Sequence, residues 1–444
     1  MVRSKVLLLS IMLLSLILYA AAPPIIDGRK STQELRVNSE RLLKRIMELA
    51  EIGKNAQGGI DRMAFTEADI QGRSHVITVM REAGLKVRID EAGNIIGRKE
   101  GIDPEFPPIV FGSHIDTVPN GGKYDGAAGV LTAIECVQVL QECGVFTRHS
   151  LEVVVFTDEE GGLVGSLSII GELPEKALNM ASREGKSIRE GIRALGGDPD
   201  SISHAIRHSE DIKAFIELHI EQGGVLEAKK INIGIVEGIV GINRWEVNIE
   251  GFSNHAGTTP MNMRQDALLA ASHLILAVNR VVTSLPGRQV GTVGKIRAEP
   301  GAPNVIPGLV VMSLEIRNLS AQKIQALFES IKQEAGAIEE KTGTKITFAR
   351  GEATAVPAPT DPGVRGCIAL AAEELSLSTL LMPSGAGHDA QNMARIVPTG
   401  MIFIPSVGGV SHSPKEYSRP EDIANGANVL LHTILKIDQG CLGR

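Results

Sequence analysis

The sequence predicts an α/β protein, in which a smaller α+β domain is inserted into a larger domain built on a mixed sheet covered by helices. Three observations predict this class. The 444 residues exceed the length of one ordinary domain, and 43% of them are hydrophobic, which suffices for a large core. The 48 glycines are typical of many tight loops. Helical and strand patterns also alternate along the chain, which favours a mainly parallel or mixed sheet between helices.

The first half of the chain contains the alternating pattern. Apolar side chains recur on one face of the first segment, which is typical of an amphipathic helix. Short apolar runs between the helical segments predict strands. In chain order, the predicted helices are Thr32–Ile52, Thr66–Ala83 and Gly126–Cys143, and the predicted strands are Leu85–Ile89, Pro108–Phe111 and Leu151–Phe156.

The pattern changes near Ile239, where strand and helix follow the order β-α-β-β-α-β of the ferredoxin-like plan. The predicted strands are Arg244–Ile249, Gly291–Ile296, Leu309–Ile316 and Lys345–Ala349, and the predicted helices are Asp266–Val282 and Ala321–Thr342. A helix at Val364–Leu375 and a strand at Gly400–Ile404 then resume the first pattern. We therefore expect a larger domain from residues 32–239 and 357–444, with residues 240–356 inserted into it.

The N-terminus has the pattern of a secretory signal. Arg3 and Lys5 precede an apolar run, residues 6–18, and alanines follow it. The run is shorter than the roughly 20 apolar residues of a spanning helix. Pro23 directly after the alanines disfavours cleavage there, so an uncleaved anchor is an alternative. Residues 1–22 thus predict export to the periplasm, secretory pathway or extracellular space, or anchoring to a membrane, which the protein would contact only if this segment is retained.

Charge and cysteine content limit the possible partners and covalent links. The net charge of −7 and the lack of any basic block exclude nucleic acid as a predicted partner. The four cysteines form neither a CxxC pair nor a zinc pattern. An exported protein could hold one disulfide, but their spacing favours free or buried thiols.

Polar clusters follow the apolar runs. His114 and Asp116 are two residues apart and would point the same way in an extended chain, and a glycine-rich loop can bring Asp125 back beside His114. In a second cluster, Glu159 and Glu160 follow another acid, and adjacent acids repel one another unless cations are nearby. Taken singly, each cluster could be an ordinary solvated turn.

Two further clusters, which contain His219 and His412, also follow apolar runs. Four predicted strand ends thus carry His, Asp or Glu, and sites in open α/β sheets form at the carboxyl ends of strands. Mixed imidazole and carboxylate ligands suit Zn²⁺, Mn²⁺, Co²⁺ or Ni²⁺. Five ligands that share one carboxylate suit two such ions about 3.5–4 Å apart.

The order of these motifs resembles the amidase/hydantoinase/carbamoylase branch of the M20 metallopeptidase superfamily. The resemblance covers nearly everything from about Thr32 to the end. The branch contains N-carbamoyl-L-amino-acid hydrolases, β-ureidopropionases, allantoate amidohydrolases and ureidoglycolate amidohydrolases. The matching motifs are GSHIDTVPNGGKYDG, DEEG, ELHIEQG, NHAGTTPMNMRQDA, APNVIPG, SGAGHDAQ and GGVSHSPKE.

The resemblance implies a catalytic domain with two divalent ions and an inserted lid and dimerisation domain. Glu159 would be the general base for the metal-activated water and then the acid for the leaving nitrogen. Asp116 would support His114 from behind. The implied ligands are His114, Asp125 and His219 for one ion, and Asp125, Glu160 and His412 for the other.

The resemblance also implies residues that contact the small-molecule substrate. His255, in the inserted domain, would stabilise the developing oxyanion in the other subunit of a homodimer. Asn304 and Arg317 would clamp the substrate carboxylate. Gln222 would contact the ureido end. Backbone groups of two further residues would approach the substrate closely: Gly385 and Ala386.

The expected function is therefore metal-dependent cleavage of the C–N bond of a carbamoyl- or ureido-substituted small acid, of the N-carbamoyl-amino acid or allantoate class. A peptidase or acyl-amino-acid hydrolase of the same superfamily is one alternative, and a non-catalytic metal-binding protein is another. The sequence departs from the family at one place. After Glu-Glu-Gly the family often has a polar residue followed by Arg-Phe, whereas this chain has Gly162, Leu163 and Val164, which leaves the subfamily open.

Overall fold

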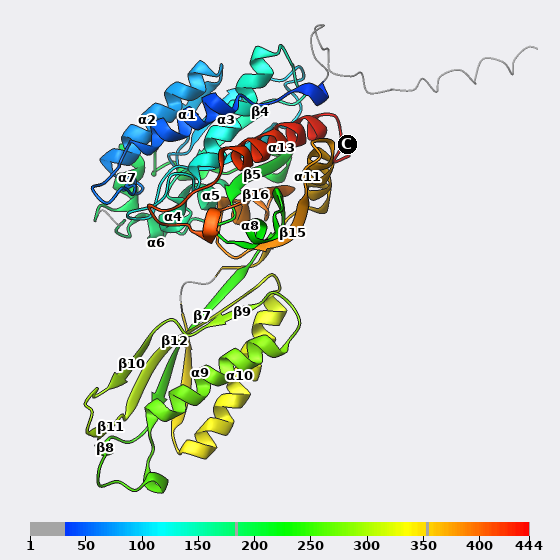
Figure 1. The fold of residues 1–444 in the computed structure, drawn as a ribbon. Coiled ribbons are helices and arrows are strands. Elements are labelled where there is room, and N and C mark those ends of the chain that lie inside the picture. The colour runs from blue at the N-terminus through cyan, green and yellow to red at the C-terminus, as the bar shows by residue number, and fades with distance from the viewer. Residues whose placement is uncertain (1–31, 183–184, 352–354, 444) are drawn as a thin grey trace, which may run out of the picture.

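The computed structural model describes residues 32–182, 185–351 and 355–443, so the predicted signal or anchor lies outside the described residues. Figure 1 shows two bodies: a sheet between layers of helices, and a smaller sheet with two helices on one face. The strand β7 leads from the larger body into the smaller one. The predicted α/β class with an inserted α+β domain is confirmed.

The larger sheet has nine strands in the order β1-β2-β4-β3-β5-β16-β6-β14, and β15 also pairs with β6. Strand pairing is both parallel and antiparallel, as predicted for a mixed sheet. The strands are β1 (Lys86–Ile89), β2 (Ile95–Lys99), β3 (Ile109–His114), β4 (Leu151–Phe156), β5 (Ala214–Ile220), β6 (Ile233–Ile239), β14 (Ala358–Pro359), β15 (Thr379–Ser384) and β16 (Thr399–Ile404).

Four neighbouring strands decide where the site forms. β4, β3, β5 and β16 lie side by side and are parallel, with His114 opposite Phe156 and Phe403 opposite His219. The carboxyl ends of all four strands therefore meet at one edge of the sheet. β3, β4 and β5 are buried throughout, which explains why their sequences are mostly apolar.

Helices cover both faces of this sheet. One face packs against α1 (Ser39–Ala50), α2 (Glu67–Glu82), α3 (Ala127–Glu142), α11 (Pro362–Glu374) and α13 (Pro420–Asp438). Shorter helices lie on the other side or at the sheet edge: α4 (Glu159–Gly162), α5 (Val164–Ile169), α6 (Glu175–Leu178), α7 (Ile188–Ala194), α8 (Val225–Lys229) and α12 (Asp389–Met393).

The first helix is shorter than predicted. The segment Thr32–Glu34 is a separate 3₁₀ turn, and α1 begins only at Ser39. The side chain of Asn38 accepts a hydrogen bond from the amide of Arg41, which caps the helix and fixes its start. The apolar periodicity alone does not reveal this cap.

The smaller body follows the predicted β-α-β-β-α-β order around its own core. Its sheet has the order β10-β12-β7-β13, and β9 also pairs with β12. The elements are β7 (Gly241–Glu250), β8 (Asn254–His255), α9 (Ala267–Ser284), β9 (Val290–Thr292), β10 (Ile296–Glu299), β11 (Val305–Ile306), β12 (Leu309–Asn318), α10 (Ala321–Thr342) and β13 (Lys345–Arg350).

One predicted strand of this body is two strands. Thr292 pairs with Glu315, and Ile296 pairs with Met312. Between these two pairs the chain advances four residues on this segment but only three on β12. The extra residue interrupts the pairing, and the predicted strand Gly291–Ile296 is divided into β9 and β10.

Two further features concern α9 and the cysteines. By length and composition α9 could cross a membrane, but it packs beside α10 on the smaller sheet. Cys367 and Cys441 form a disulfide, so the preference for free thiols was wrong for this pair. The residues lie 74 apart in sequence, and only the packing of α11 against α13 brings them together. Cys136 and Cys143 are free.

Candidate active site

The predicted metal ligands converge at the carboxyl edge of the four parallel strands. His114 ends β3, and the loop that follows it returns to place Asp125 against the His114 ring. Gly126 makes this return possible, because it has a φ of +60° and a Cβ there would lie 2.5 Å from that ring. His219 comes from β5, Glu160 follows β4 and His412 follows β16.

Asp125 stands between two groups of ligands. Its Oδ1 atom lies 3.5 Å from Nε2 of His114 and 3.2 Å from Nε2 of His219. Its Oδ2 atom lies 3.4 Å from Nε2 of His412, which in turn lies 3.4 Å from Oε1 of Glu160. The structure therefore forms the two predicted ligand groups, which share one carboxylate.

The spacing and the tautomers of these groups fit divalent metal ions. Ligand atoms bound tetrahedrally at about 2.1 Å from an ion lie about 3.4 Å from one another, close to the separations here. Nδ1 of His114 bonds the carbonyl of Asp116 at 3.0 Å, and Nδ1 of His219 bonds the carbonyl of Ile220 at 2.9 Å. A carbonyl only accepts, so each Nδ1 carries a proton, and in the neutral ring each Nε2 has a lone pair that can bind a metal.

The charge state of Asp125 also suits a metal site. Burial would raise the pKa of Asp125, but His219, His114 and His412 outweigh burial and hold that pKa well below its usual range. The carboxylate therefore remains ionised in a buried position. A divalent cation held by these residues would take the place of the histidine protons and balance the same buried anion.

Glu159 is a buried carboxyl beside this centre. Its Oε2 atom lies 3.7 Å from Nε2 of His114. Burial raises the pKa of Glu159 well above its usual range; the His114 ring opposes the shift, and the acids Asp389 and Glu160 add to it. A carboxyl with a raised pKa can both accept and return a proton near neutral pH.

Asp116 supports the site differently from the prediction. Its backbone carbonyl, rather than its carboxylate, is nearest to Nδ1 of His114, because Oδ1 lies 3.6 Å away. The carboxylate instead accepts from the amides of Glu159 at 3.3 Å and Glu160 at 3.0 Å. Asp116 thus positions one ligand of each group, His114 and Glu160, together with the predicted base Glu159.

The sequence analysis missed Glu416 as a site residue. Its Oε1 atom accepts from the amides of Tyr124 at 2.8 Å and Asp125 at 3.1 Å. Oγ of Ser411 lies 2.9 Å from Oδ2 of Asp125 and 3.0 Å from Oε2 of Glu416. Glu416 therefore holds the Asp125 loop in place. The available signal was its position within the motif GGVSHSPKE, four residues after His412.

A third group of acid and imidazole side chains lies behind His219. Glu217 accepts from Oγ of Ser113 at 2.6 Å and from the amide of Ala390 at 3.0 Å. The His388 ring packs against His219 with centroids 4.5 Å apart, and its Nε2 lies 2.9 Å from Oγ of Ser384. Glu217 and Nε2 of His388 are therefore already engaged in hydrogen bonds within the protein.

A cavity of about 280 Å³ opens over the two ligand groups. Among the predicted substrate residues, Gln222, Arg317 and Ala386 line it. The side chain of Gln222 donates to Oδ2 of Asp125 at 2.7 Å. Arg317 donates to Glu315 and to the carbonyl of Gly385, both at 2.6 Å. The full lining is Asp125, Glu159, Glu160, Leu163, His219, Gln222, Ile242, Arg317, Ala386, Gly387, His388 and His412.

Two predicted residues lie elsewhere in the described chain. His255 in β8 pairs with Val305 in β11, and the amide of Ala256 donates to the carbonyl of Asn304 at 3.0 Å. In Figure 1 these strands lie at the end of the smaller body that is far from the larger sheet. The structure therefore brings His255 and Asn304 together, but it does not bring Asn304 to Arg317 within one described chain.

The ring of His255 has a defined tautomer. Its Nδ1 atom accepts from the amides of Gly257 at 3.0 Å and Thr258 at 3.2 Å. The neutral ring therefore carries its proton on Nε2. His255 is exposed, so this N–H can act as a hydrogen-bond donor to another molecule.

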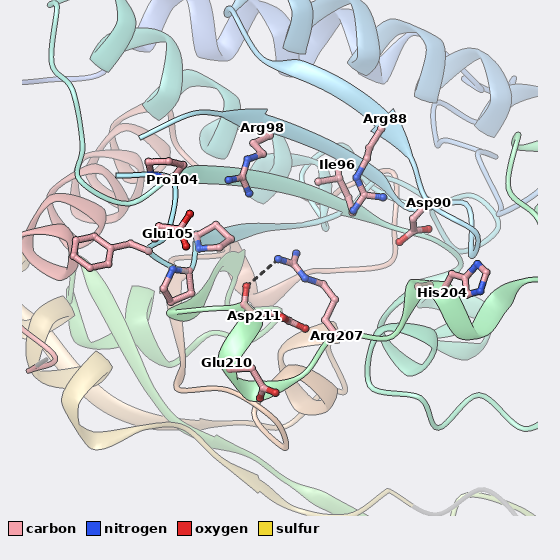
Figure 2. Close-up of a pocket in the computed structure, with 14 residues that line it drawn as sticks. Arg88, Asp90, Ile96, Arg98, Pro104, Glu105, His204, Arg207, Glu210 and Asp211 are labelled. Atoms are coloured by element: carbon pink, nitrogen blue, oxygen red, sulfur yellow. Dashed lines mark hydrogen bonds between the residues drawn. The ribbon is translucent and has the colours of Figure 1, made fainter. Parts of the chain in front are cut away.

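Another pocket, of about 370 Å³, lies beside β1 and β2 and is shown in Figure 2. Two of its arginines are engaged in structural contacts, because Arg98 and Arg207 both bind Glu152, at 2.8 and 2.6 Å. Asp90 accepts from the amides of Ala92 and Asn94. None of the metal-ligand groups found among the described residues lies here, so this pocket is a poor candidate for the catalytic site.

Two ligand groups that share Asp125, with the buried carboxyl of Glu159 beside them, are the features of a metal-dependent hydrolase. The chain belongs to peptidase family M20/M25/M40, whose model matches residues 110–436.

Similar proteins extend along nearly the whole chain. The N-carbamoyl-L-amino acid amidohydrolase of Geobacillus stearothermophilus is 42% identical over 91% of this chain and 100% of its own length. The ureidoglycolate hydrolase of Arabidopsis thaliana is 39% identical over 91% of this chain and 87% of its own. A crystal structure of a hydantoinase/carbamoylase family amidase from Burkholderia multivorans matches with a TM-score of 0.86 and 34% identity, over 90% of this chain and 98% of that chain. The predicted family and the predicted class, a hydrolase of non-peptide carbon–nitrogen bonds, are confirmed.

Proposed function

We propose that the protein hydrolyses the carbamoyl C–N bond of a small carbamoyl- or ureido-substituted acid, with an N-carbamoyl-L-amino acid as the preferred class. Water would add to the carbamoyl carbon, and the products would be the amino acid, carbon dioxide and ammonia. The observation that carries this proposal is the pair of ligand groups around Asp125 with Glu159 beside them, in a chain 42% identical to an N-carbamoyl-L-amino acid amidohydrolase along that protein's full length.

The residues of the site have separate tasks in this reaction. Divalent ions held by the two groups would lower the pKa of water and polarise the carbamoyl oxygen. Glu159 would take the proton of the attacking water and then return it to the leaving nitrogen, a task that suits its raised pKa. Arg317 would orient the substrate carboxylate, because a guanidinium matches the planar geometry of that group.

We also propose that two ions bind, and that they are Zn²⁺, Mn²⁺, Co²⁺ or Ni²⁺. The proposal rests on the two oxygens of Asp125, each of which faces a different group of ligands. Imidazole and carboxylate donors are common to all four metals, so the donor set supports the class and does not select one metal.

A homodimer would complete this site. His255 lies far from the cavity of its own chain. Its Nε2–H can donate a hydrogen bond to an oxyanion. The helix α9 of the same body exposes Leu268, Leu269 and Leu276. Exposed leucines on one helix support a contact between two copies, through which His255 would enter the site of the partner.

We further propose that the protein is exported or anchored to a membrane by residues 1–22. The sequence of that segment motivates the proposal. The Cys367–Cys441 disulfide is independent support, because disulfides persist mainly in oxidising compartments. Expression of the full chain, followed by fractionation and N-terminal sequencing, tests it. Recovery only from the cytoplasm with Met1 intact would contradict export.

A panel of substrates tests the proposed reaction. The chain without residues 1–22 would be stripped of metal, supplied with each of the four ions, and offered N-carbamoyl-L-amino acids, allantoate, ureidoglycolate, N-acyl-amino acids and dipeptides. The proposal predicts metal-dependent ammonia from an N-carbamoyl-L-amino acid. Cleavage of acyl-amino acids or dipeptides alone would favour the peptidase alternative. Metal binding without any cleavage would favour a non-catalytic protein.

A further inference from the structure

Apolar side chains line the catalytic cavity directly beside the metal-ligand groups. Leu163 and Ile242 share this cavity with Asp125, Glu160 and Arg317. The two apolar residues come from different bodies of the molecule: Leu163 follows β4 in the larger body, and Ile242 lies at the start of β7, which leads into the smaller one. Apolar side chains beside charged catalytic groups reduce the hydration of those groups, which has a cost in free energy. We therefore asked which part of a substrate they could contact.

The backbone fixes Leu163 in place. Leu163 joins α4 to α5 with a φ of +55° and a ψ of 32°, a left-handed conformation that leucine rarely adopts. Its carbonyl accepts from the amide of Leu167 at 2.9 Å, and the next turn is held by the amide of Gly165, which donates to Thr157 at 2.8 Å. Leu163 is thus a fixed neighbour of α4, the helix that begins with Glu159.

Ile242 is fixed beside Arg317. The register of β7 and β12 places Ile242 directly opposite Arg317. Residues directly opposite one another in an antiparallel pair project from the same face, with Cβ atoms about 4.5–5.5 Å apart. A substrate carboxylate bound by Arg317 would therefore place its α-substituent within reach of Ile242.

We propose that Leu163 and Ile242 form a subsite for the α-substituent of the substrate, and that this subsite selects N-carbamoyl-α-amino acids with aliphatic or thioether side chains. This inference rests on the proposed function and narrows its substrate class. Contact with the two side chains removes apolar surface of such a substrate from water, which favours its binding. A charged side chain, the second ureido group of allantoate or the hydroxyl of ureidoglycolate would lose water there without a hydrogen-bonding partner from either residue.

Steady-state kinetics of the metal-restored enzyme test the subsite. The substrates are N-carbamoyl-L-leucine, N-carbamoyl-L-methionine, N-carbamoylglycine, N-carbamoyl-L-aspartate and allantoate. We expect kcat/KM for the leucine and methionine compounds to exceed that for the glycine compound by at least about tenfold, since hydrophobic pockets discriminate single methylenes by about 10-fold or more. The aspartate compound and allantoate should rank below the glycine compound.

Two substitutions keep the backbone and change the polarity of the surface. Leu163→Asn is suitable because Asn tolerates positive φ, and Ile242→Thr keeps a β-branched side chain in the strand. Each should lower the leucine-to-glycine ratio of kcat/KM by about tenfold. Leu370→Asn and Ile296→Thr, at exposed positions of α11 and β10, are the matched controls and should leave the ratio unchanged.

The outcomes separate this inference from the proposed function. Ammonia release with equal kcat/KM for the leucine and glycine compounds, or a preference for aspartate or allantoate, overturns the subsite and leaves the carbamoyl hydrolase standing. Unchanged ratios in both folded variants overturn it as well. No ammonia from any carbamoyl compound overturns the proposed function and the subsite with it. If a variant does not fold, the wild-type ratio alone decides.

Discussion

Nε2 of His412 lies 3.4 Å from Oδ2 of Asp125, the oxygen on the side away from the other two histidines of the centre. Because each oxygen of Asp125 faces a different ligand group, both groups need Asp125. His412, by contrast, belongs to one of the two groups. Asp125→Asn should lose nearly all bound metal, since a neutral amide cannot bridge two cations. His412→Ala should lose only about one of two ions, because the His114 group is intact.

Metal analysis of the dialysed variants by mass spectrometry checks this prediction, with the wild type as the reference. Circular dichroism establishes that both variants are folded. If Asp125→Asn keeps the metal content of the wild type, the bridging role is wrong.

Glu159→Gln should abolish turnover and leave the metal content unchanged. The amide keeps the shape of the side chain but cannot take a proton, and Glu159 belongs to neither ligand group. Loss of a general base costs roughly 10²–10⁴-fold in rate. Ammonia release and metal content are measured on the same preparation. A rate near that of the wild type would remove Glu159 from the role of base.

His255→Ala should impair turnover without loss of metal, and it should be complemented by Glu159→Gln. Mixing the two inactive chains through unfolding and reassembly would create heterodimers with one intact site, where His255 of one chain serves Glu159 of the other. Random assembly of a symmetric dimer would restore about a quarter of wild-type activity. If His255 acts within its own chain, the mixture stays as inactive as its components.

The disulfide between Cys367 and Cys441 should contribute to stability. It closes a loop of 74 residues between α11 and the segment after α13. Cys441→Ser should lower the free energy of unfolding by about 2–4 kcal/mol. Chemical denaturation of the wild type and of Cys441→Ser gives this difference, and Cys143→Ser, at an exposed free cysteine, is the control. Equal stability of Cys441→Ser and the control would show that the bond does not form.

His432 should make the protein less stable in mild acid. Its Nε2 atom lies 3.0 Å from the carbonyl of Leu35. Burial lowers the pKa of His432; the Leu35 carbonyl and Glu374 oppose this shift, and Arg36 and Lys436 add to it. The unfolded chain, with a histidine pKa near 6.5, therefore binds the proton more readily than the folded chain. Stability from this group is present above pH 6.5 and is lost as the pH falls towards the folded pKa.

His432→Gln removes this titration, so its free energy of unfolding should fall less than that of the wild type between about pH 7 and pH 5. Urea unfolding at several pH values provides the comparison. Parallel pH dependences of the two proteins would show that His432 titrates equally in the folded and unfolded states.

Much of the site could be predicted because its ligands follow apolar strands. Parallel strands bring their carboxyl ends to one edge, so His114, His219 and His412 could be assigned to one centre without knowing the loops. The β-α-β-β-α-β order of the inserted body could be predicted because its helices have clear periodicity and its strands alternate between buried and exposed positions.

The remaining features depend on contacts that sequence spacing does not contain. Glu416 holds the Asp125 loop across two segments that are remote in the chain, and its position in the motif after His412 does not show which atoms it contacts. The backbone carbonyl of Asp116 supports His114, but sequence patterns show only side chains. Cys367 and Cys441 meet only because two helices pack together. The split of one predicted strand into β9 and β10 arises from its register with β12.

The central claim is that the centre around Asp125 hydrolyses a carbamoyl C–N bond by metal-dependent chemistry. The most direct test is ammonia release from N-carbamoyl-L-leucine by the metal-stripped chain, before and after one of the four ions is restored, with Glu159→Gln as the matched control. The account predicts no ammonia without metal, ammonia and leucine in equal amounts with metal, and none from Glu159→Gln in either state. Equal rates with and without metal, or a Glu159→Gln rate that matches the wild type, would contradict it.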